Sequence, residues 1–566
     1  MRLFDVDISH SAFSLLKNNK RVMTTVEEAN RFLQKECGVK DFFTRDSELS
    51  QLVECLDYTY TYEACESNAE YGDFQTNQHL TTLVTEKLKN NGLSPKVVIE
   101  PTCGKGHFIL SVLGTFDEVD KIFGIEIQEK HIWQAKFNVL DFFINNPNKR
   151  KPEICIVHSN IFDYNYQTIK KSIGEKELLL IGNPPWVTNS ELSAMDSSNL
   201  PQKSNFKQHK GFEAMTGKGN FDIAEYIIID LLRNFGNYKG NMAVLVKNTV
   251  IRNIVYDIPK LKLPIANLKK QNIDAKKEFC VSVDAALFSC QLNQDTECYC
   301  QESDFYTSEV KCDFGWKNSK FMSILSADND IDGISPIVWR QGIKHDCSKV
   351  MELDYDGNSY CNKLGEHFSL EDNLVYPLLK SSDLKTTIAN PTQRMTIVTQ
   401  KFVGQDTSYI KNYPQTFEYL NKHMDLFQVR KSSIYRGKCP FSIFGIGDYS
   451  FKPYKIAISG LYKTFHFCLV KPQNNKPVML DDTCYFIGFE TLEQAEYIWN
   501  LLNSEIVENL LKSISFGDTK RMITKDILMR IDLRKLAKIK GVESYFEDNI
   551  KKNQGMQLTL FDRESI

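Results

Sequence analysis

Residues 178–186 read Leu-Leu-Leu-Ile-Gly-Asn-Pro-Pro-Trp, an apolar run that leads directly into a rigid polar turn. Four consecutive apolar residues are typical of a strand that is buried on both faces, as in a parallel sheet. Pro184 and Pro185 fix two φ angles and remove two backbone donors, so the turn is stiff and its carbonyl groups can act as acceptors. The stretch therefore predicts an amide side chain, Asn183, at the carboxyl end of a buried strand.

Short apolar runs of the same kind recur on both sides of this strand. They lie at 97–99, 121–125, 153–157 and 242–246, and patterns of helical spacing separate them. Short buried runs that alternate with helices are typical of a doubly wound α/β sheet. We therefore predict an α/β domain over residues 66–300, with ligands bound beyond the carboxyl ends of its strands.

The sequence changes character outside this domain. Residues 1–65 carry apolar side chains at helical spacing, which predicts a helical N-terminal segment. Residues 301–335 are polar and rich in Asp and Ser, which predicts a linker. Residues 336–566 lose the βα rhythm and are rich in Tyr, Phe and Lys, so we expect a second domain of the α+β class.

Composition sets broad limits. A chain of 566 residues exceeds what one hydrophobic core usually supports. Its start lacks the layout of a signal peptide and no apolar run approaches about 20 residues, so we expect a cytoplasmic protein with no membrane contact. The 15 cysteines are scattered without zinc-ligand spacing, which favours free thiols and no metal. A net charge of -3 does not exclude nucleic acid, because a local basic surface decides binding.

Three further strand ends carry polar groups that suit a nucleoside. Gly104 and Gly106 follow the first strand, and Glu126 ends the next, at the spacing at which a carboxylate can accept both ribose hydroxyls. Asn160 follows the third strand and can bind an adenine edge, while Ile161 or Phe162 covers the ring. Ile109 stands where a dinucleotide fingerprint requires glycine, and the Gly-Lys-Ser/Thr of a P-loop is missing. The pattern predicts a nucleoside pocket without a diphosphate grip.

The Asn-Pro-Pro-Trp turn suits chemistry on an amine. The exocyclic amine of a base is a poor nucleophile, because its lone pair is delocalised into the ring. The Asn183 side-chain oxygen and the Pro184 carbonyl can accept both amine hydrogens and stabilise the charge that develops on nitrogen. Trp186 offers a flat face to an extruded base. With a sulfonium cofactor as the source of the methyl group, these residues predict amine methylation.

These motifs resemble those of the gamma-class DNA N6-adenine methyltransferases, over about residues 68–290. The resemblance implies a Rossmann-like domain with a mostly parallel seven-stranded sheet and a terminal antiparallel strand, with S-adenosylmethionine as cofactor. It implies catalytic roles for Asn183, Pro184, Pro185, Trp186 and Phe279. It implies cofactor contacts for Phe74, Thr76, Glu100, Thr102, Gly104, Gly106, Phe108, Glu126, Ile127, Asn160, Ile161 and Asn183.

Two positions depart from the pattern of this family, and a third has an alternative interpretation. Asn77 stands where the family more often has proline after Thr76, and Asn160 stands where it usually has aspartate. Phe279 matches the aromatic residue that stacks on the flipped base, and a buried core phenylalanine is the alternative.

The C-terminal half contains a basic segment, residues 428–470, with seven Lys or Arg, one acidic residue and nine aromatic residues. Basic and aromatic side chains together suit phosphate and base contacts. The segment resembles parts of DNA target-recognition domains, so residues 336–566 are expected to bind double-stranded DNA. The expected contacts are Arg430, Lys431, Arg436, Lys438, Lys455 and Lys463, with Lys520 and Arg521 in a second loop.

We therefore predict a site-specific DNA methyltransferase that modifies N6 of a flipped adenine in a restriction-modification or related defence system. The expected protein is a monomer, with a separately encoded restriction endonuclease as a candidate partner. A bifunctional enzyme with an unrecognised nuclease and an RNA adenine methyltransferase are the alternatives. The choice between N6-adenine and N4-cytosine also stays open.

Overall fold

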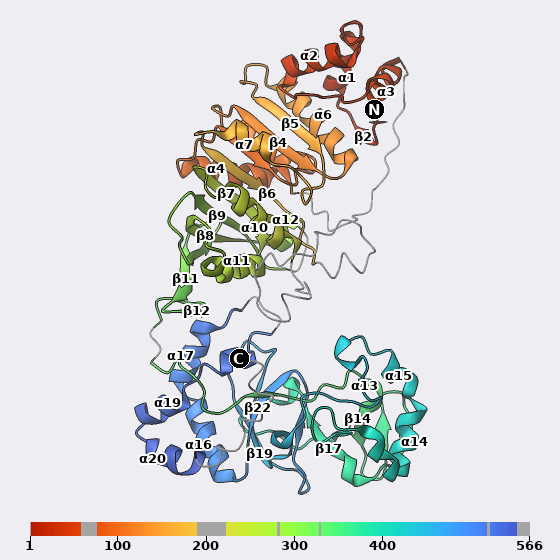
Figure 1. Ribbon diagram of the computed structural model, residues 1–566, viewed down its shortest axis with the longest axis vertical. Helices are drawn as coiled ribbons and strands as arrows, with labels where there is room; N and C mark the ends of the chain where they lie inside the picture. The colour runs from red at the N-terminus through yellow and green to blue at the C-terminus, as the bar shows by residue number, and fades with distance from the viewer. Residues whose placement is uncertain are drawn as a thin grey trace. The chain divides into compact units, whose positions relative to one another are not determined.

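The computed structural model describes residues 2–57, 76–188, 222–279, 283–327, 330–517 and 521–551. The chain forms two compact units, Met1–Phe321 and Met322–Ile566, which we call unit 1 and unit 2 (Figure 1). Within the described ranges no helix has both the length and the apolar character needed to cross a membrane. Cysteines in these ranges are free thiols.

Unit 1 is built on a ten-stranded sheet of order β12-β11-β10-β8-β9-β7-β6-β3-β4-β5. Its strands are β3 (Val97–Glu100), β4 (Lys121–Glu126), β5 (Glu153–His158), β6 (Leu178–Gly182), β7 (Gly240–Lys247), β8 (Ile265–Ile273), β9 (Ala285–Leu292), β10 (Tyr299–Asp304), β11 (Val310–Lys317) and β12 (Lys320–Met322). Strands β5, β4, β3, β6 and β7 pair in parallel, and β9 runs antiparallel between β7 and β8. The predicted α/β fold, with a seven-stranded sheet and an antiparallel last strand, is confirmed in β3 to β9.

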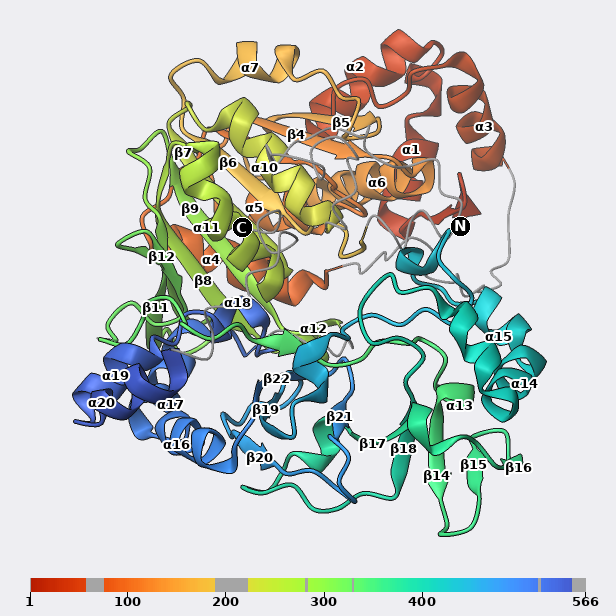
Figure 2. The ribbon, with the colours of Figure 1, turned by 60° about the horizontal axis from the view of Figure 1, so that its bottom comes forward.

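Helices cover both faces of this sheet, and Figure 2 shows α10 and α11 together on one face. The helices are α4 (Gln78–Asn90), α5 (His107–Thr115), α6 (Glu129–Asn145), α7 (Gln167–Ile173), α10 (Ile223–Phe235), α11 (Asn248–Leu261) and the short α12 (Ala275–Phe279). Every residue of β3 and β6 is buried, as expected for parallel strands covered on both sides.

The predicted linker over residues 301–335 is wrong for its first part. Strand β10 pairs in parallel with β8 and antiparallel with β11, so these residues extend the sheet instead. The polar side chains of β10 do not give the apolar pattern of a buried strand. They are accommodated in the sheet because they bind polar side chains of β8. Glu302 accepts from Lys270 Nζ at 3.1 Å and from Asn272 Nδ2 at 2.7 Å. Unit 1 therefore continues to Phe321 rather than ending near residue 300.

The N-terminal part of the chain packs into unit 1. It holds β1 (Arg2–Leu3), β2 (Val6–Asp7), α1 (His10–Asn18), α2 (Val26–Cys37) and α3 (Asp46–Asp57). The ring of Phe42 lies 5.6 Å from Phe137 and 6.3 Å from Trp133, both on α6. Lys136 Nζ donates to the Phe42 carbonyl at 2.7 Å, and burial lowers the pKa of Lys136 to about 8. The buried apolar side chains of residues 6–56 belong to the same core as those of α4, α5 and α6.

Unit 2 is of the α+β class, as predicted. A four-stranded sheet of order β13-β22-β19-β20 and a six-stranded sheet of order β16-β15-β14-β18-β17-β21 form it. The strands are β13 (Arg340–Gln341), β14 (Glu352–Tyr355), β15 (Tyr360–Asn362), β16 (His367–Phe368), β17 (Val375–Leu379), β18 (Arg394–Ile397), β19 (Tyr454–Ser459), β20 (Cys468–Val470), β21 (Met479–Leu480) and β22 (Cys484–Phe489).

Two groups of helices accompany these sheets. The first is α13 (Ser348–Met351), α14 (Pro414–Lys422) and α15 (Met424–Gln428), and the second is α16 (Leu492–Leu502), α17 (Glu505–Ile514), α18 (Lys525–Leu528), α19 (Leu533–Ile539) and α20 (Glu543–Tyr545). Residues of α16, α17 and α19 form one core with the four-stranded sheet, and Figure 2 shows α16, α17, α19 and α20 grouped together.

We predict that Phe42→Ala lowers the free energy of unfolding of unit 1 by about 3–5 kcal/mol, because it leaves a cavity against α6. Val22→Ala is the control within the same part of unit 1, since Val22 is 51% exposed and its loss should cost less than about 0.5 kcal/mol. Urea unfolding, followed by hydrogen exchange in peptides of unit 1, measures both. A loss below about 1 kcal/mol for Phe42→Ala would show that residues 1–57 are peripheral to this core.

Candidate functional site

A cavity of about 130 Å³ lies at the carboxyl ends of β3, β4, β5 and β6. Most residues predicted to bind the cofactor or the amine line it. They are Thr76, Glu100, Thr102, Gly104, Phe108, Glu126, Ile127, Asn160, Ile161, Asn183, Pro184, Pro185 and Trp186. The parallel sheet thus brings four separate sequence motifs to one place, as the strand-end argument expects.

The glycine loop after β3 turns tightly beneath the cavity. Gly104 and Gly106 have φ angles of +50° and +80°, a region that side chains with a Cβ rarely adopt. The Gly106 amide donates to the Cys103 carbonyl at 2.8 Å and closes the turn. A Cβ on Gly106 would lie 3.1 Å from that of Ala135 on α6. Gly106 is therefore adjacent to the cavity and serves helix packing, whereas Gly104 lines it.

Glu126, at the end of β4, is held in a fixed orientation. Its Oε2 accepts from the Gly104 amide at 2.8 Å, and its Oε1 accepts from the Gln128 amide at 2.8 Å. His131 Nδ1 lies 4.0 Å from Oε1, on the first turn of α6. Each carboxylate oxygen keeps a second lone pair, so Glu126 can accept both hydroxyls of a ribose.

Glu100, at the end of β3, is a second carboxyl group in the same cavity, but its surroundings differ. The side chain is buried, and its Oε2 has no hydrogen-bond partner among the residues that the structure describes. Burial raises the pKa of Glu100 well above its usual value, and the charge of Glu126 adds to the shift. The cavity thus contains a buried carboxyl group beside the hydrogen-bonded Glu126.

Asn183 is oriented by Thr76, which lies two residues before α4. Its Nδ2 donates to Thr76 Oγ1 at 3.1 Å, so Oδ1 is the end of the amide that can accept from a substrate. Thr102 Oγ1 donates to the Asn183 backbone carbonyl at 3.4 Å. His107 Nδ1 lies 2.5 Å from the Thr76 carbonyl oxygen and donates to it. Thr76 therefore holds the side-chain amide of Asn183, while Thr102 binds the Asn183 backbone and His107 binds Thr76.

Two aromatic side chains meet beside this amide. Trp186 lines the cavity and donates from Nε1 to the Leu245 carbonyl at 3.2 Å. Phe279, on α12, meets the Trp186 ring edge to face at a centroid distance of 4.9 Å. Phe279 is 8% exposed and packs on Trp186, which lines the cavity.

The remaining predicted cofactor residues complete the wall after β5. Asn160 Oδ1 accepts from the Phe162 amide at 3.1 Å, so Nδ2 is the end of this amide that can donate to a bound molecule. Ile161 is buried and Ile127 is 41% exposed. Phe74 lies outside the described residues. His107 and His131 also line the cavity, and sequence reasoning missed both, because neither stands at a strand end.

The basic segment 428–470 in unit 2 divides into buried and exposed side chains. Lys455 was predicted to contact DNA, and this is wrong: it lies on β19 between β20 and β22, is 1% exposed and donates to the Lys452 carbonyl at 2.6 Å. Burial lowers the pKa of Lys455 to about 7. A lysine in the centre of a sheet cannot reach a phosphate.

Arg430 also departs from the predicted role. Its guanidinium donates to the carbonyls of Phe427, Ser442 and Pro440 at 2.8 to 3.0 Å, and it lies 3.7 Å from the centroid of the Tyr435 ring. These bonds use most of its donors inside the protein. Arg430 therefore fastens its loop, and we correct its assignment as a DNA contact.

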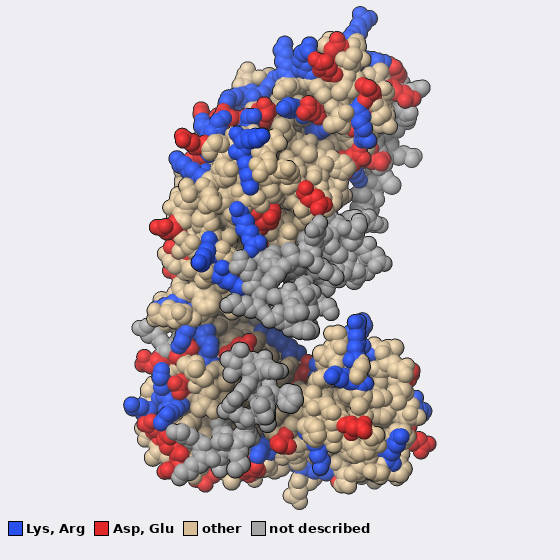
Figure 3. Space-filling view, viewed as in Figure 1, with Lys and Arg blue, Asp and Glu red and all other residues tan. Residues whose placement is uncertain are grey.

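The other predicted contacts differ in exposure. Lys431, Arg436, Lys438 and Lys463 are exposed. Arg521 donates to the carbonyl and to Oδ2 of Asp482, at 2.8 and 3.1 Å. Lys520 lies outside the described residues. The face drawn in Figure 3 carries Lys and Arg interspersed with Asp and Glu, which fits a net charge near zero.

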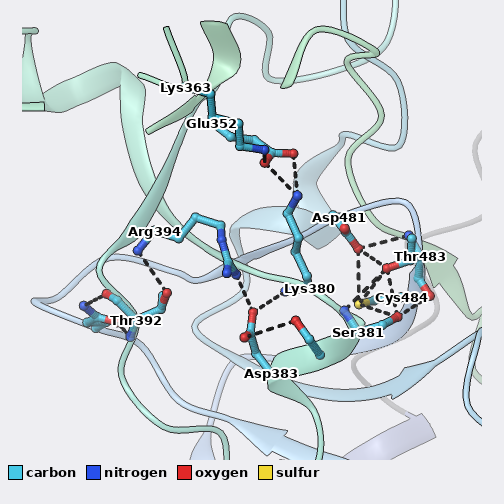
Figure 4. Close-up of polar contacts among 12 residues, drawn as sticks. Glu352, Lys363, Lys380, Ser381, Asp383, Thr392, Arg394, Asp481, Thr483 and Cys484 are labelled. Carbon is cyan, nitrogen blue, oxygen red and sulfur yellow. Dashed lines mark hydrogen bonds and ion pairs between the residues drawn. The ribbon is translucent and has the colours of Figure 1, made fainter. Parts of the chain in front are cut away.

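Lys431 lines a cleft of about 880 Å³ within unit 2, and a buried carboxylate supports its wall. Lys380 Nζ donates to Glu352 Oε1 and Oε2 at 2.7 and 2.6 Å, and Lys363 binds the same group, as Figure 4 shows. Burial acts to raise the pKa of Glu352, but the two lysine hydrogen bonds outweigh it and hold the pKa below its usual value. The cleft is thus a rigid surface of mixed charge.

Comparison with known proteins gives one relative of high coverage. The type II methyltransferase M.NspV of Nostoc sp. is 40% identical over 476 residues, which cover 83% of this chain and 98% of that protein. No protein-family model matches the chain. The structure of the type IIL restriction-modification enzyme MmeI in complex with DNA gives a TM-score of 0.51 at 15% identity, over 81% of this chain and 63% of that one. The chain spans less than two thirds of the MmeI structure, and the likeness shows the fold alone.

We predict that Glu126→Gln raises the Kd of S-adenosylmethionine about 10- to 100-fold. The amide places an NH₂ group against a backbone N–H and removes a charge-assisted acceptor, a loss of about 1.5–3 kcal/mol. Isothermal titration calorimetry measures the change. Glu129→Gln is the matched control, because Glu129 is exposed and pairs with Arg45 at 3.0 Å. Equal Kd values for Glu126→Gln and wild type would contradict the ribose assignment.

Proposed function

The chain belongs to the type II methyltransferase family, and from this premise we propose that it transfers a methyl group from S-adenosylmethionine to N6 of adenine in double-stranded DNA. The observation that carries the proposal is the oriented amide of Asn183, whose nitrogen binds Thr76 and which lines the cavity together with Pro184, Pro185 and Trp186. A restriction-modification setting follows from the family.

The residues in the cavity fit a nucleoside cofactor with a charged tail. Glu126 supplies acceptors for the ribose hydroxyls, and Asn160 Nδ2 supplies a donor for the adenine edge. Glu100 Oε2, buried without a partner in the described part of the chain, offers a polar atom that a bound molecule would satisfy. When bound, S-adenosylmethionine supplies a methyl group on a sulfonium, which is the electrophile.

The protein's part in the reaction is to prepare the amine. Asn183 Oδ1 and the Pro184 carbonyl each accept one N–H, which draws the lone pair out of the ring and favours a pyramidal nitrogen. The prepared nitrogen would then take up the methyl group that the bound cofactor supplies. The amine loses one proton, so the product is a neutral secondary amine. Trp186 and Phe279 supply apolar cover that excludes water at this point.

Unit 2 supplies the contacts to DNA in this proposal. Lys431, Arg436, Lys438 and Lys463 are exposed on the basic segment, and Lys431 lines the cleft of unit 2. Exposed lysines and arginines neutralise phosphates and position the duplex, while groups of both signs in a cleft can read base edges. We propose that the protein acts as a monomer in the cytoplasm and is paired with a separately encoded restriction endonuclease.

We predict that Asn183→Ala lowers kcat about 10²- to 10³-fold, as removal of one preorganised hydrogen-bond partner does elsewhere, with the Kd values of cofactor and DNA within about threefold. The assay uses labelled S-adenosylmethionine with plasmid DNA, RNA or protein and identifies the methylated product. Asn91→Ala, an exposed amide at the end of α4, is the control. Label in N6-methyladenine of RNA but not DNA would refute the substrate, and N4-methylcytosine would refute adenine.

We predict that Lys431→Ala and Lys438→Ala each weaken DNA binding at all sequences and reduce the slope of log Kd against log salt by about one. Lys455→Met should leave both quantities unchanged, because Lys455 is buried in its sheet. Fluorescence anisotropy at several salt concentrations measures the slope. A loss of affinity in Lys455→Met as large as that in Lys431→Ala would contradict the placement of the DNA surface.

A further inference from the structure

Asn77 stands where the resembled family more often has proline, and its side chain has two partners here. Its Oδ1 accepts from the Leu80 amide at 2.7 Å and caps the N-terminus of α4. Its Nδ2 donates to Glu278 Oε2 at 3.1 Å, across 201 positions of sequence. A proline could do neither, because its ring carries no polar group. The bond between the start of α4 and α12 thus depends on the particular side chains of this protein.

Glu278 receives a second donor from another part of unit 1. Its Oε1 accepts from the Tyr306 hydroxyl at 3.0 Å. Tyr306 lies in the turn between β10 and β11, the strands that extend the sheet. Burial, together with the bond to Glu278, raises the pKa of Tyr306 to about 12, so its hydroxyl remains a donor. Both oxygens of one carboxylate are therefore bound, by Asn77 on one side and Tyr306 on the other.

The bond from Asn77 to Glu278 lies next in sequence to the bond that orients the Asn183 amide. Thr76, next to Asn77, accepts from Asn183 Nδ2. Phe279, next to Glu278, meets the ring of Trp186 at 4.9 Å. Two neighbouring residues before α4 thus hold the two sides of the amine site, one through the amide and one through α12.

We propose that Glu278 is a positioning residue that holds α12 between Asn77 and Tyr306 and thereby sets Phe279 beside the target base. The inference rests on the proposed function. Helix α12 has only five residues, too few to be stable through its own backbone bonds, so side-chain tethers fix its place. Hydrogen bonds to a carboxylate are roughly twice as strong as those between neutral groups, which suits a short and partly exposed element.

The test compares Glu278→Ala, Glu278→Gln and Tyr306→Phe with wild type, and Lys276→Ala serves as a control on an exposed residue of the same helix. We expect kcat to fall about tenfold in Glu278→Ala and about threefold in Tyr306→Phe, with the KM for S-adenosylmethionine within twofold. Glu278→Gln keeps one acceptor oxygen and should recover at least half of the lost rate on a logarithmic scale. The double variant Glu278→Ala/Tyr306→Phe should be no slower than Glu278→Ala, because both remove one interaction.

Three results would overturn the proposed role of Glu278. Wild-type kcat in Glu278→Ala, or fully multiplicative effects in the double variant, would overturn the inference. A rise in the KM for S-adenosylmethionine that matches the fall in kcat would also overturn it, since it would show a general loss of structure. Tyr306 is 45% exposed, so Tyr306→Phe gives a result even where Glu278→Ala folds poorly. The variants are assayed on whichever substrate the wild type methylates, so failure on DNA would count against the proposed function alone.

Discussion

The parallel pairing of β6 with β3 on one side and β7 on the other is the constraint on which the site depends. Leu178 to Leu180 lie in register with Val97 to Ile99, so the two strands end at the same edge of the sheet. Glu100 and Asn183 therefore arrive side by side, although 82 residues of sequence separate them. The strands β4 and β5 continue the same register and add their own polar ends. Side-chain chemistry in the cavity follows from this backbone arrangement.

Two carboxyl groups, Glu100 and Glu126, line this cavity, and their hydrogen-bond partners differ. Glu126 receives two backbone N–H groups, one on each carboxylate oxygen. Glu100 Oε2 has no hydrogen-bond partner among the described residues, and burial raises the pKa of Glu100 well above its usual value. One sheet edge thus holds two carboxyl groups with different hydrogen-bond partners.

In unit 2, the position of each basic side chain relative to the sheets decides whether it can meet a partner. Lys455 is buried on β19, which lies between β20 and β22, and Arg430 is bound to carbonyl groups of its own loop. The exposed Lys431, Arg436, Lys438 and Lys463 come from the same segment. A run of basic residues in sequence is therefore not yet a basic surface. Its aromatic residues are part of the cores that hold the segment in place.

The sequence by itself determined the α/β fold of unit 1 and the polar residues at four strand ends, because both depend on short patterns that the local chain carries. A buried strand needs only consecutive apolar residues, and a rigid turn needs only its prolines. It did not determine that residues 299–322 extend the sheet, because polar strands such as β10 become stable only beside the polar side chains of β8. Nor did it determine the burial of Lys455 or the bond of Asn77 to Glu278, which join residues far apart in the chain. Only the tertiary structure decided these, since a polar side chain's role depends on the partner that folding brings to it.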